Sequence, residues 1–445
     1  MSVTPKRELS LFDSTCIIVG IIIGAGIYQM APDIAKGAGS AWAVFGIWIV
    51  GGLLSLCGAL SYAELATAYP RAGGDYVYLS KAYGPWAGFL FGWAQLTVVR
   101  PGDIAVMAFA FATYGRAIYD PLAGHPAISQ RVFAAGATLV LTIINILGVR
   151  QGKWTQNLLT TAKALGLLAI VGIALIAPRE AKSTAEVSGL PWTLALIFVL
   201  FTYGGWNEMA YVAAEVRNPR RNIVRALVVG TAAVIALYLL VNGAFLYTLG
   251  YQGLATSQAV ASETIATVFP TVGSRLISAL ICISALGAVN GLIFTGARIS
   301  YALGEDHRLF QVLGRWDPRT GTPVWALAVQ GFIALCLILA FGGYIDAILY
   351  TAAAVYAFYL GTSLSVIVLR FKEPGVERPY RVTGYPITPL IFSGVCAFLI
   401  YSSLNYARAF KPKSLVVLAV MLTAGVAVYL LTKTRRTPVA ADSQP

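Results

Sequence analysis

Long apolar stretches follow one another along almost the entire chain, and this feature limits most strongly what the sequence can fold into. A helix needs about 20 mainly apolar residues to cross the hydrocarbon core of a bilayer. Apolar runs bounded by charged residues, Pro or Gly predict twelve such helices, with approximate limits 14–36, 41–68, 85–115, 129–148, 155–177, 192–216, 223–249, 274–302, 323–341, 346–370, 386–406 and 412–432. We therefore predict an all-α integral membrane protein with twelve transmembrane helices.

The small supply of charged side chains favours the same fold class. Only 11% of the 445 residues are charged and 58% are hydrophobic, whereas about 25% are charged in an ordinary soluble domain. This composition excludes a cytosolic enzyme and a nucleic-acid-binding protein. The two histidines, His125 and His307, lie in loops on opposite predicted sides. With no metal-ligand cluster and no nucleophile–base pattern in the sequence, we expect no metal, no cofactor and no enzymatic activity.

The basic residues are distributed unevenly between the two predicted sides of the membrane. With the amino terminus inside, 21 Lys and Arg residues fall on the inner side and 9 on the outer side. Because cytoplasmic loops carry the excess of Lys and Arg, we predict that both termini are cytoplasmic. The distribution also explains most of the net charge of +13 without nucleic acid as a partner. The sequence has no Asn-x-Ser/Thr motif, which favours the inner membrane of a prokaryote.

Two predicted helices contain glycines at the depth of the membrane centre. The first contains Gly24, Ala25 and Gly26, and the sixth contains Gly204 and Gly205. Glycine weakens a helix by about 1 kcal/mol relative to alanine, and unwound backbone at this depth must line a cavity or be buried in protein. Close helix packing through small residues is the alternative. The breaks occupy corresponding places in two five-helix halves, however, which points to the binding site of a secondary transporter.

Backbone groups released at the two breaks predict a zwitterionic ligand. A half-helix that begins near Ile27 has free N–H groups and the positive end of a helix dipole, which suit a carboxylate. The carbonyl groups released near Ile22, Phe201 and Gly204 suit an ammonium group. Together these groups complement the backbone of an α-amino acid.

Several motifs resemble those of one transporter family. IIIGAGIY at 21–28 resembles the first-helix signature IIGSGIF of the amino acid–polyamine–organocation (APC) superfamily, and FTYGGWNEMAYVAAEVRNPRRNI at 201–223 resembles its sixth helix and the following loop. Residues 59–93 resemble its second-to-third helix region, and residues 289–310 resemble its eighth helix. The resemblance spans roughly residues 9–381 and is closest to the L-type amino acid transporter branch.

The resemblance implies a LeuT-like fold, in which two groups of five helices form an inverted repeat with broken helices 1 and 6. The implied division of the chain is a first repeat (helices 1–5) at 9–180, a second repeat (helices 6–10) at 190–372, helices 11 and 12 at 386–432, and a disordered tail at 437–445.

The resemblance also implies roles for the residues at the breaks. The N–H groups of Ala25 and Gly26 would hold the substrate carboxylate, and the carbonyls of Ile22, Phe201 and Gly204 would hold the amine. Phe201 would also form an aromatic gate over the site.

Four other side chains are expected near the substrate. Tyr28 stands where the family often has Phe, so it would add a polar tip to the gate. Asn207 follows the second break. Asn290 and Tyr356 could reach the side-chain pocket, although polar residues of this kind more often form packing contacts between helices. Ala25 replaces the usual Ser, which removes a hydroxyl contact and keeps the backbone contact.

Two basic residues lie within predicted spans, where a charge is costly and is a functional hypothesis by default. Lys163 could extend to the membrane interface. The resemblance instead places it near the cation site of sodium-coupled relatives, where its ammonium would replace sodium. Arg100 could pair with Asp103 three residues later. Alternatively it could select the substrate, since an arginine at this position resembles the cystine–glutamate exchanger, whose substrates are anionic.

These features predict a secondary transporter that exchanges neutral L-amino acids by alternating access without sodium. The alternatives are a proton-coupled symporter, a carrier of anionic or cationic amino acids or polyamines, and an amino-acid sensor with the same fold. The external loop at 114–130 has no cysteine, so we expect no disulfide-linked heavy chain as a partner. The expected partners are the amino acid substrate and the lipid bilayer.

Overall fold

The computed structural model describes residues 5–178, 187, 189–340, 352–410 and 412–432. Within these ranges the regular structure is helical, apart from isolated bridges between Leu9 and Val216 and between Asp317 and Thr322. The predicted disordered tail at 437–445 lies outside the described residues, as does the start of the predicted tenth span.

The helices alternate between long elements and short connecting pieces. In chain order they are α1 (Leu11–Ile22), α2 (Gly26–Gln29), α3 (Ala31–Ala38), α4 (Ala41–Ala68), α5 (Asp75–Tyr83), α6 (Pro85–Ala94), the π-helix η1 (Gln95–Val99), α7 (Arg100–Ile118), α8 (Pro126–Leu147), α9 (Val149–Ile176), α10 (Trp192–Thr202), the 3-10 helix η2 (Trp206–Glu215), α11 (Pro219–Thr256), α12 (Val260–Ala266), α13 (Gly273–Asp306), the 3-10 helix η3 (Arg308–Phe310), α14 (Val324–Ala340), α16 (Ala352–Lys372), α17 (Ile387–Phe410) and α18 (Pro412–Leu431).

Nine helical segments in the described part of the chain are long and apolar enough to cross a membrane. They include α4, whose bounds coincide with the predicted span at 41–68. The predicted spans at 323–341 and 412–432 correspond to shorter apolar helices, and the span at 192–216 is divided between α10 and η2. The chain is therefore a multi-pass helical membrane protein.

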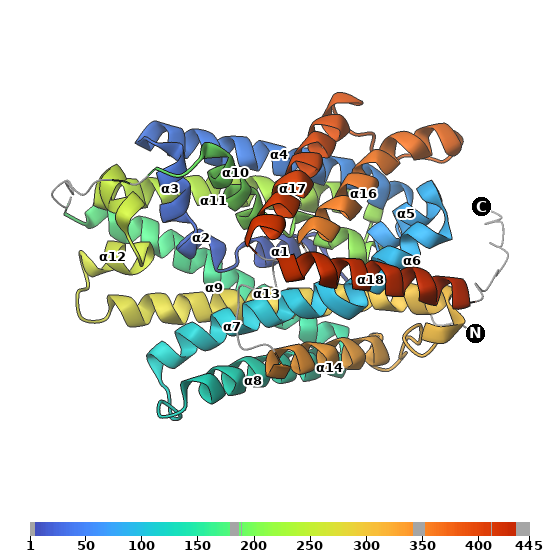
Figure 1. Ribbon diagram of the computed structural model, residues 1–445, viewed down its shortest axis with the longest axis horizontal. Helices are drawn as coiled ribbons and strands as arrows, with labels where there is room; N and C mark the ends of the chain where they lie inside the picture. The colour runs from blue at the N-terminus through green and yellow to red at the C-terminus, as the bar shows by residue number, and fades with distance from the viewer. Residues whose placement is uncertain (1–4, 179–186, 188, 341–351, 411, 433–445) are drawn as a thin grey trace.

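Long helices run side by side across the molecule, and the first break lies near its centre. Figure 1 shows α4, α11, α9, α13 and α7 crossing the view, with α1 and α2 between them. The contacts agree with this view, since α1 packs against α9, α11, α13 and η2. A surface helix would have one polar face; α1 instead has many buried apolar residues and touches neighbours on several sides.

The first break begins where α1 loses its helical geometry. Ser10 caps the start of α1 through a capping box with Asp13, which fixes the beginning of the helix. At the other end Ile23 has φ −74° and ψ 81°, so the regular hydrogen-bond pattern cannot continue. Helical structure resumes at Gly26. The interruption predicted at residues 24–26 is thus present.

The second break requires a glycine and contacts the first. Gly205 has φ +107°, a left-handed conformation that favours glycine. A Cβ atom on Gly205 would lie 2.7 Å from Cγ2 of Ile21, so a side chain would not fit against α1. On the other side, a Cβ atom on Gly26 would lie 3.1 Å from Oγ1 of Thr202. The two breaks therefore lie directly against each other.

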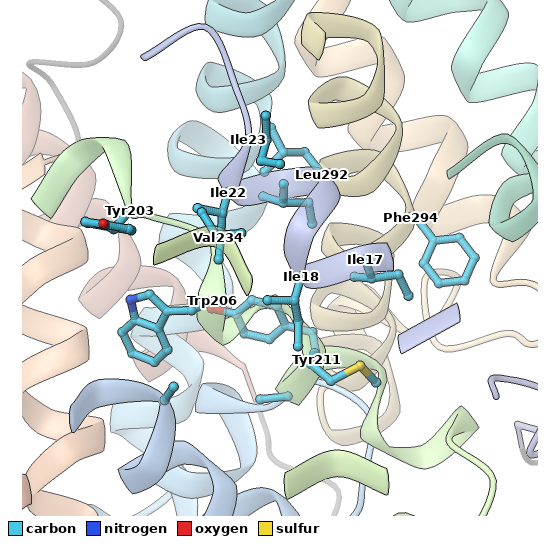
Figure 2. Close-up of a cluster of buried hydrophobic side chains, with 14 of the residues drawn as sticks. Ile17, Ile18, Ile22, Ile23, Tyr203, Trp206, Tyr211, Val234, Leu292 and Phe294 are labelled. Carbon is cyan, nitrogen blue, oxygen red and sulfur yellow. The ribbon is translucent and has the colours of Figure 1, made fainter. Parts of the chain in front are cut away.

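Apolar packing holds the two breaks in place. Ile18 and Ile22 of α1 share one buried cluster with Trp206 of η2, Val234 of α11 and Leu292 of α13 (Figure 2). Burying side chains of this size stabilises the protein by about 1.5–3 kcal/mol each in water. In a membrane the gain comes chiefly from van der Waals contacts between the helices, so close fit at this cluster is what orients the broken segments.

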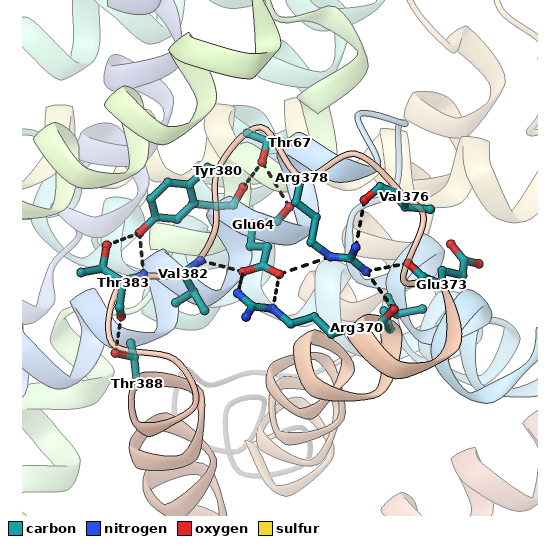
Figure 3. A network of polar contacts seen from close by, with 12 residues as sticks. Glu64, Thr67, Arg370, Glu373, Val376, Arg378, Tyr380, Val382, Thr383 and Thr388 are labelled. Atoms are coloured by element: carbon teal, nitrogen blue, oxygen red, sulfur yellow. Dashed lines mark hydrogen bonds and ion pairs between the residues drawn. The ribbon is translucent and has the colours of Figure 1, made fainter.

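Two ion-pair networks, one partly buried and one fully buried, connect distant helices. Glu64 of α4 accepts hydrogen bonds from both Nε and Nη2 of Arg370 at 2.8 and 2.6 Å, and from the N–H of Val382 at 2.6 Å (Figure 3). Arg298 of α13 likewise binds Glu215 at the end of η2 through two hydrogen bonds of 2.7 and 2.9 Å. Charges this deep are tolerated because each carboxylate oxygen has a donor.

Candidate functional site

A cavity of about 210 Å³ lies where the two breaks meet. Its wall contains Gly24 and Gly26 from the first break and Gly204 and Gly205 from the second. Side chains from five surrounding helices complete the wall, among them Ser55, Asp103, Met107, Leu292, Tyr356 and Phe392. A largely apolar cavity with a few polar groups is the usual form of a small-molecule site.

Free backbone donors lie at the first break. The N–H groups of Ala25, Gly26 and Ile27 have no acceptor among the residues that the structure describes. The N–H of Gly24 instead turns back to the carbonyl of Ile22, at 2.8 Å. From Gly26 onward α2 and α3 are nearly continuous, because Met30 between them keeps helical dihedral angles. Free N–H groups at the beginning of a helical segment are suited to a carboxylate.

The three predicted carbonyl groups differ in the number of donors that they already accept. The Ile22 oxygen accepts hydrogen bonds from the N–H of Gly24 and from the hydroxyl of Tyr238, at 2.8 and 2.9 Å. Since a carbonyl has two lone pairs, Ile22 has little capacity left for a ligand. The Phe201 oxygen accepts the N–H of Gly204 at 3.0 Å and is also approached by the N–H of Tyr203, and the Gly204 oxygen has no donor in the described ranges. Of the three carbonyls, Gly204 thus has the most capacity to bind an amine.

Of the two gate residues, only Phe201 lines the cavity. Phe201 is partly exposed and Tyr356, predicted as a pocket residue, also forms part of the wall. Tyr28 is 3% exposed and is not among the residues that line the cavity. Its position in the packed core separates it from the ligand space in this conformation.

The two predicted asparagines lie behind the cavity wall. Asn207 donates from Nδ2 to the Tyr211 hydroxyl at 2.8 Å. Asn290 donates to Oε1 of Gln156 and to the carbonyl of Gly152, at 2.9 and 3.1 Å. Both side chains are fully buried, so Asn290 forms the packing contact between α13 and α9 that was its alternative role.

Lys163 joins three elements at the first break. Its ammonium group donates to the carbonyls of Gly20, Ile23 and Ser284, at 2.5, 2.7 and 3.1 Å. The side chain is fully buried, which argues against the alternative that it extends to the membrane interface. The ammonium occupies the space between α1, α9 and α13.

Arg100 has a different partner from the one expected. Nη1 of Arg100 lies 2.9 Å from Oε1 of Glu208 on η2, and no ion pair joins Arg100 to Asp103 in the described residues. The second carboxylate oxygen of Glu208 accepts a hydrogen bond from Thr295 at 2.5 Å. Arg100 itself is buried behind the cavity, whereas Glu208 and Asp103 line it.

Sequence reasoning missed Glu208, although a signal for it was present. Glu208 is an acidic residue inside the predicted sixth span, directly after Asn207, and a charge at that depth indicates function or a buried partner. The cavity residues from α17, among them Phe392 and Cys396, carried no such signal, because apolar residues on the eleventh helix resemble any lipid-facing residue in sequence.

Comparison with known proteins assigns the chain to a family. The family model for amino acid permeases matches residues 9–430. The b(0,+)-type amino acid transporter 1 of Homo sapiens is 33% identical over 404 residues, which cover 89% of this chain and 82% of the relative. The serine/threonine exchanger SteT of Bacillus subtilis (strain 168) is 30% identical over 406 residues, covering 90% and 91%.

A third relative supports the same family assignment. The large neutral amino acids transporter small subunit 2 of Homo sapiens is 34% identical over 445 residues, which cover 96% of this chain and 80% of the relative. All three are transporters and none is an enzyme. The chain therefore belongs to the amino acid permease family of the APC superfamily and is a membrane protein of amino acid transport.

Proposed function

We propose that the protein is a sodium-independent secondary exchanger of neutral L-amino acids that works by alternating access. The observation that carries this proposal is the contact between the two helix breaks around one cavity. Free N–H groups of Ala25, Gly26 and Ile27 would bind the carboxylate, and the carbonyl of Gly204 would bind the amine next to the Phe201 side chain. The apolar remainder of the wall, with Leu292 among its residues, would receive an uncharged side chain.

We further propose that the chain has twelve spans arranged as two inverted repeats, at 9–180 and 190–372, followed by helices at 386–432. Corresponding breaks in the first and sixth spans support this division. The excess of basic residues on one predicted side supports cytoplasmic termini. The inner membrane of a prokaryote is the proposed location, and we expect no partner joined by a disulfide, because the loop at 114–130 contains no cysteine.

The position of Lys163 supports sodium independence. Its ammonium group already satisfies the carbonyls of Gly20, Ile23 and Ser284. These oxygens would otherwise be available to a cation, and a fixed positive charge beside them repels a second one. Exchange is supported by the relative from Bacillus subtilis, whose name describes a serine/threonine exchanger.

Counterflow in proteoliposomes tests the proposal. Vesicles loaded with unlabelled alanine or leucine should accumulate the labelled amino acid equally well in sodium and in choline buffer. Dependence on sodium, or uptake that requires a proton gradient and no internal substrate, would contradict the proposed mechanism. Absence of counterflow with every neutral amino acid would contradict the proposed substrates.

Two glycine variants link the activity to the breaks. Gly205→Ala places a Cβ atom 2.7 Å from Ile21 at a backbone conformation that alanine rarely adopts, so counterflow should be lost. Gly172→Ala is the matched control, because its Cβ atom would meet open space on α9. Counterflow by the control should equal that of the unaltered protein. Size-exclusion chromatography checks that both variants are folded.

A further inference from the structure

One carboxylate in the cavity wall has no hydrogen-bond or ion-pair partner in the described part of the chain. Asp103 of α7 lines the cavity and is partly exposed to it. Among the described residues, no hydrogen bond or salt bridge involves its side chain, which distinguishes it from Glu208, the other acid of the wall. An unpaired acid within a span is expensive unless it faces a polar cavity, and it usually marks a ligand or ion pathway.

The basic side chains nearest to Asp103 form their contacts with other groups. Glu208 is the second acidic residue of the wall, and both of its oxygens are engaged, one by Arg100 at 2.9 Å and the other by Thr295 at 2.5 Å. The ion pair of Arg100 is therefore with Glu208 and not with Asp103. The Asp103 carboxyl has no ion-pair partner among the described residues, and Lys163 is held by carbonyl groups at the first break.

Asp103 also lies at a suitable distance from the proposed backbone-binding groups. Met107 is four residues later on α7 and shares its face. A Cβ atom on Gly24 would lie 3.6 Å from the Met107 sulfur, so Met107 lies beside the first break. Asp103 is one helical turn away, roughly 5.4 Å along the axis. A lysine or arginine side chain is long enough to cross this distance while its α-carboxylate stays at the break.

We propose that Asp103 is a specificity-determining residue that binds the cationic side chain of basic amino acids. The protein would then exchange basic as well as neutral amino acids, since the apolar wall accepts the latter without this contact. This inference rests on the proposed function of the cavity. A guanidinium or ammonium group next to Asp103 would form a charge-assisted hydrogen bond, which is stronger than a bond between neutral groups.

Arginine and citrulline give a sharp comparison, because they have nearly the same shape and differ in the charge of the terminal group. Binding to the purified full-length protein in detergent is measured as ligand-induced thermal stabilisation, which does not depend on transport. The unaltered protein should bind arginine at least tenfold more tightly than citrulline. Asp103→Asn should reduce this preference at least tenfold, and Asp103→Glu, which retains the charge, should preserve a preference for arginine.

Glu377→Gln is the control that removes the same charge, because Glu377 forms an exposed ion pair with Arg220 and does not line the cavity. This variant should keep the preference for arginine over citrulline. Equal binding of arginine and citrulline by the unaltered protein, or an unchanged preference in Asp103→Asn, would overturn the inference. Alanine counterflow is measured in the same preparation, so that failure of this inference and failure of the proposed function can be told apart. If the proposed function fails, counterflow is absent although arginine still stabilises the protein.

Discussion

The ammonium nitrogen of Lys163 lies 2.7 Å from the carbonyl oxygen of Ile23, the first residue at which α1 is no longer helical. The same nitrogen reaches Gly20 inside α1 and Ser284 on α13. One side chain from α9 therefore satisfies carbonyl oxygens on both sides of a helix end and connects that end to a third helix. The geometry of the first break depends on this contact.

Replacing Lys163 by Met should abolish counterflow and lower the melting temperature. The methionine fills a similar volume but removes one donor from each of three buried carbonyls. Ile23 keeps the hydroxyl of Ser284 at 2.9 Å, whereas Gly20 is left without a donor among the described residues, at a cost of about 1–3 kcal/mol. The measurements are alanine counterflow and thermal unfolding in detergent. Lys81→Met is the control, because Lys81 pairs with Glu373 at a partly exposed position, and it should change neither quantity strongly. Normal counterflow by Lys163→Met would contradict this role.

The network around Glu64 predicts that the loop after α16 unfolds locally when this network is weakened. Glu64→Gln removes the charge that holds Arg370 and the N–H of Val382, and Arg378 lies 3.5 Å from the same carboxylate. Because Arg370 is partly exposed, we expect a loss of about 1–3 kcal/mol. The loop after α16 should then be cleaved by trypsin at least tenfold faster at Arg378, as measured by mass spectrometry of the fragments. Equal cleavage rates in Glu64→Gln and in the unaltered protein would refute this.

His307 predicts a dependence of stability on pH. It is 1% exposed, and burial lowers its pKa below the ordinary value of 6.5, although the nearby Asp306 partly opposes this shift. The unfolded chain therefore binds a proton more readily than the folded one. The stability contributed by neutral His307 is complete above 6.5 and is lost as the pH falls through the lower folded pKa. His307→Gln should reduce the change in melting temperature between about pH 7 and about pH 5.

His125→Gln is the control for this effect, because His125 lies in an exposed loop. It should leave the pH dependence of the melting temperature unchanged. If the two variants flatten the curve equally, burial of His307 is not its cause.

The first break and Lys163 could be predicted because their signals are local or isolated. Glycine at Gly24 and Gly26 weakens a helix whatever surrounds it, and a lone Lys in an apolar run must find a partner or reach water. The bounds of α4 could be predicted for a similar reason, since Ser40 caps its start and Tyr69 ends it.

The pairing of Arg100 could not be predicted, because it depends on how distant helices rotate. Asp103 is three residues away on the same helix, yet the guanidinium binds Glu208, which is 108 positions away in the sequence. Likewise the direction in which Asn290 faces follows from the packing of α13 against α9. Helical periodicity cannot predict which neighbour Asn290 faces, because α13 is buried on most sides.

The Arg100–Glu208 pair supplies the last prediction. Arg100→Met should strongly lower the melting temperature, because it leaves the Glu208 carboxylate buried without its counter-charge, a loss of about 3–5 kcal/mol. The double variant Arg100→Met/Glu208→Gln removes both charges and keeps the hydrogen bond from Thr295, so it should recover most of this loss. Melting temperatures of the two single variants, the double variant and the unaltered protein form the thermodynamic cycle that isolates the interaction.

Substrate competition then separates the two roles considered for Arg100. If its guanidinium is used by Glu208, as the 2.9 Å contact indicates, glutamate should not compete for alanine counterflow in the unaltered protein. The folded double variant should also show no change in its preference for anionic substrates. A protein that binds glutamate, and loses this binding together with Arg100 while its melting temperature is unaffected, would instead assign Arg100 to the substrate.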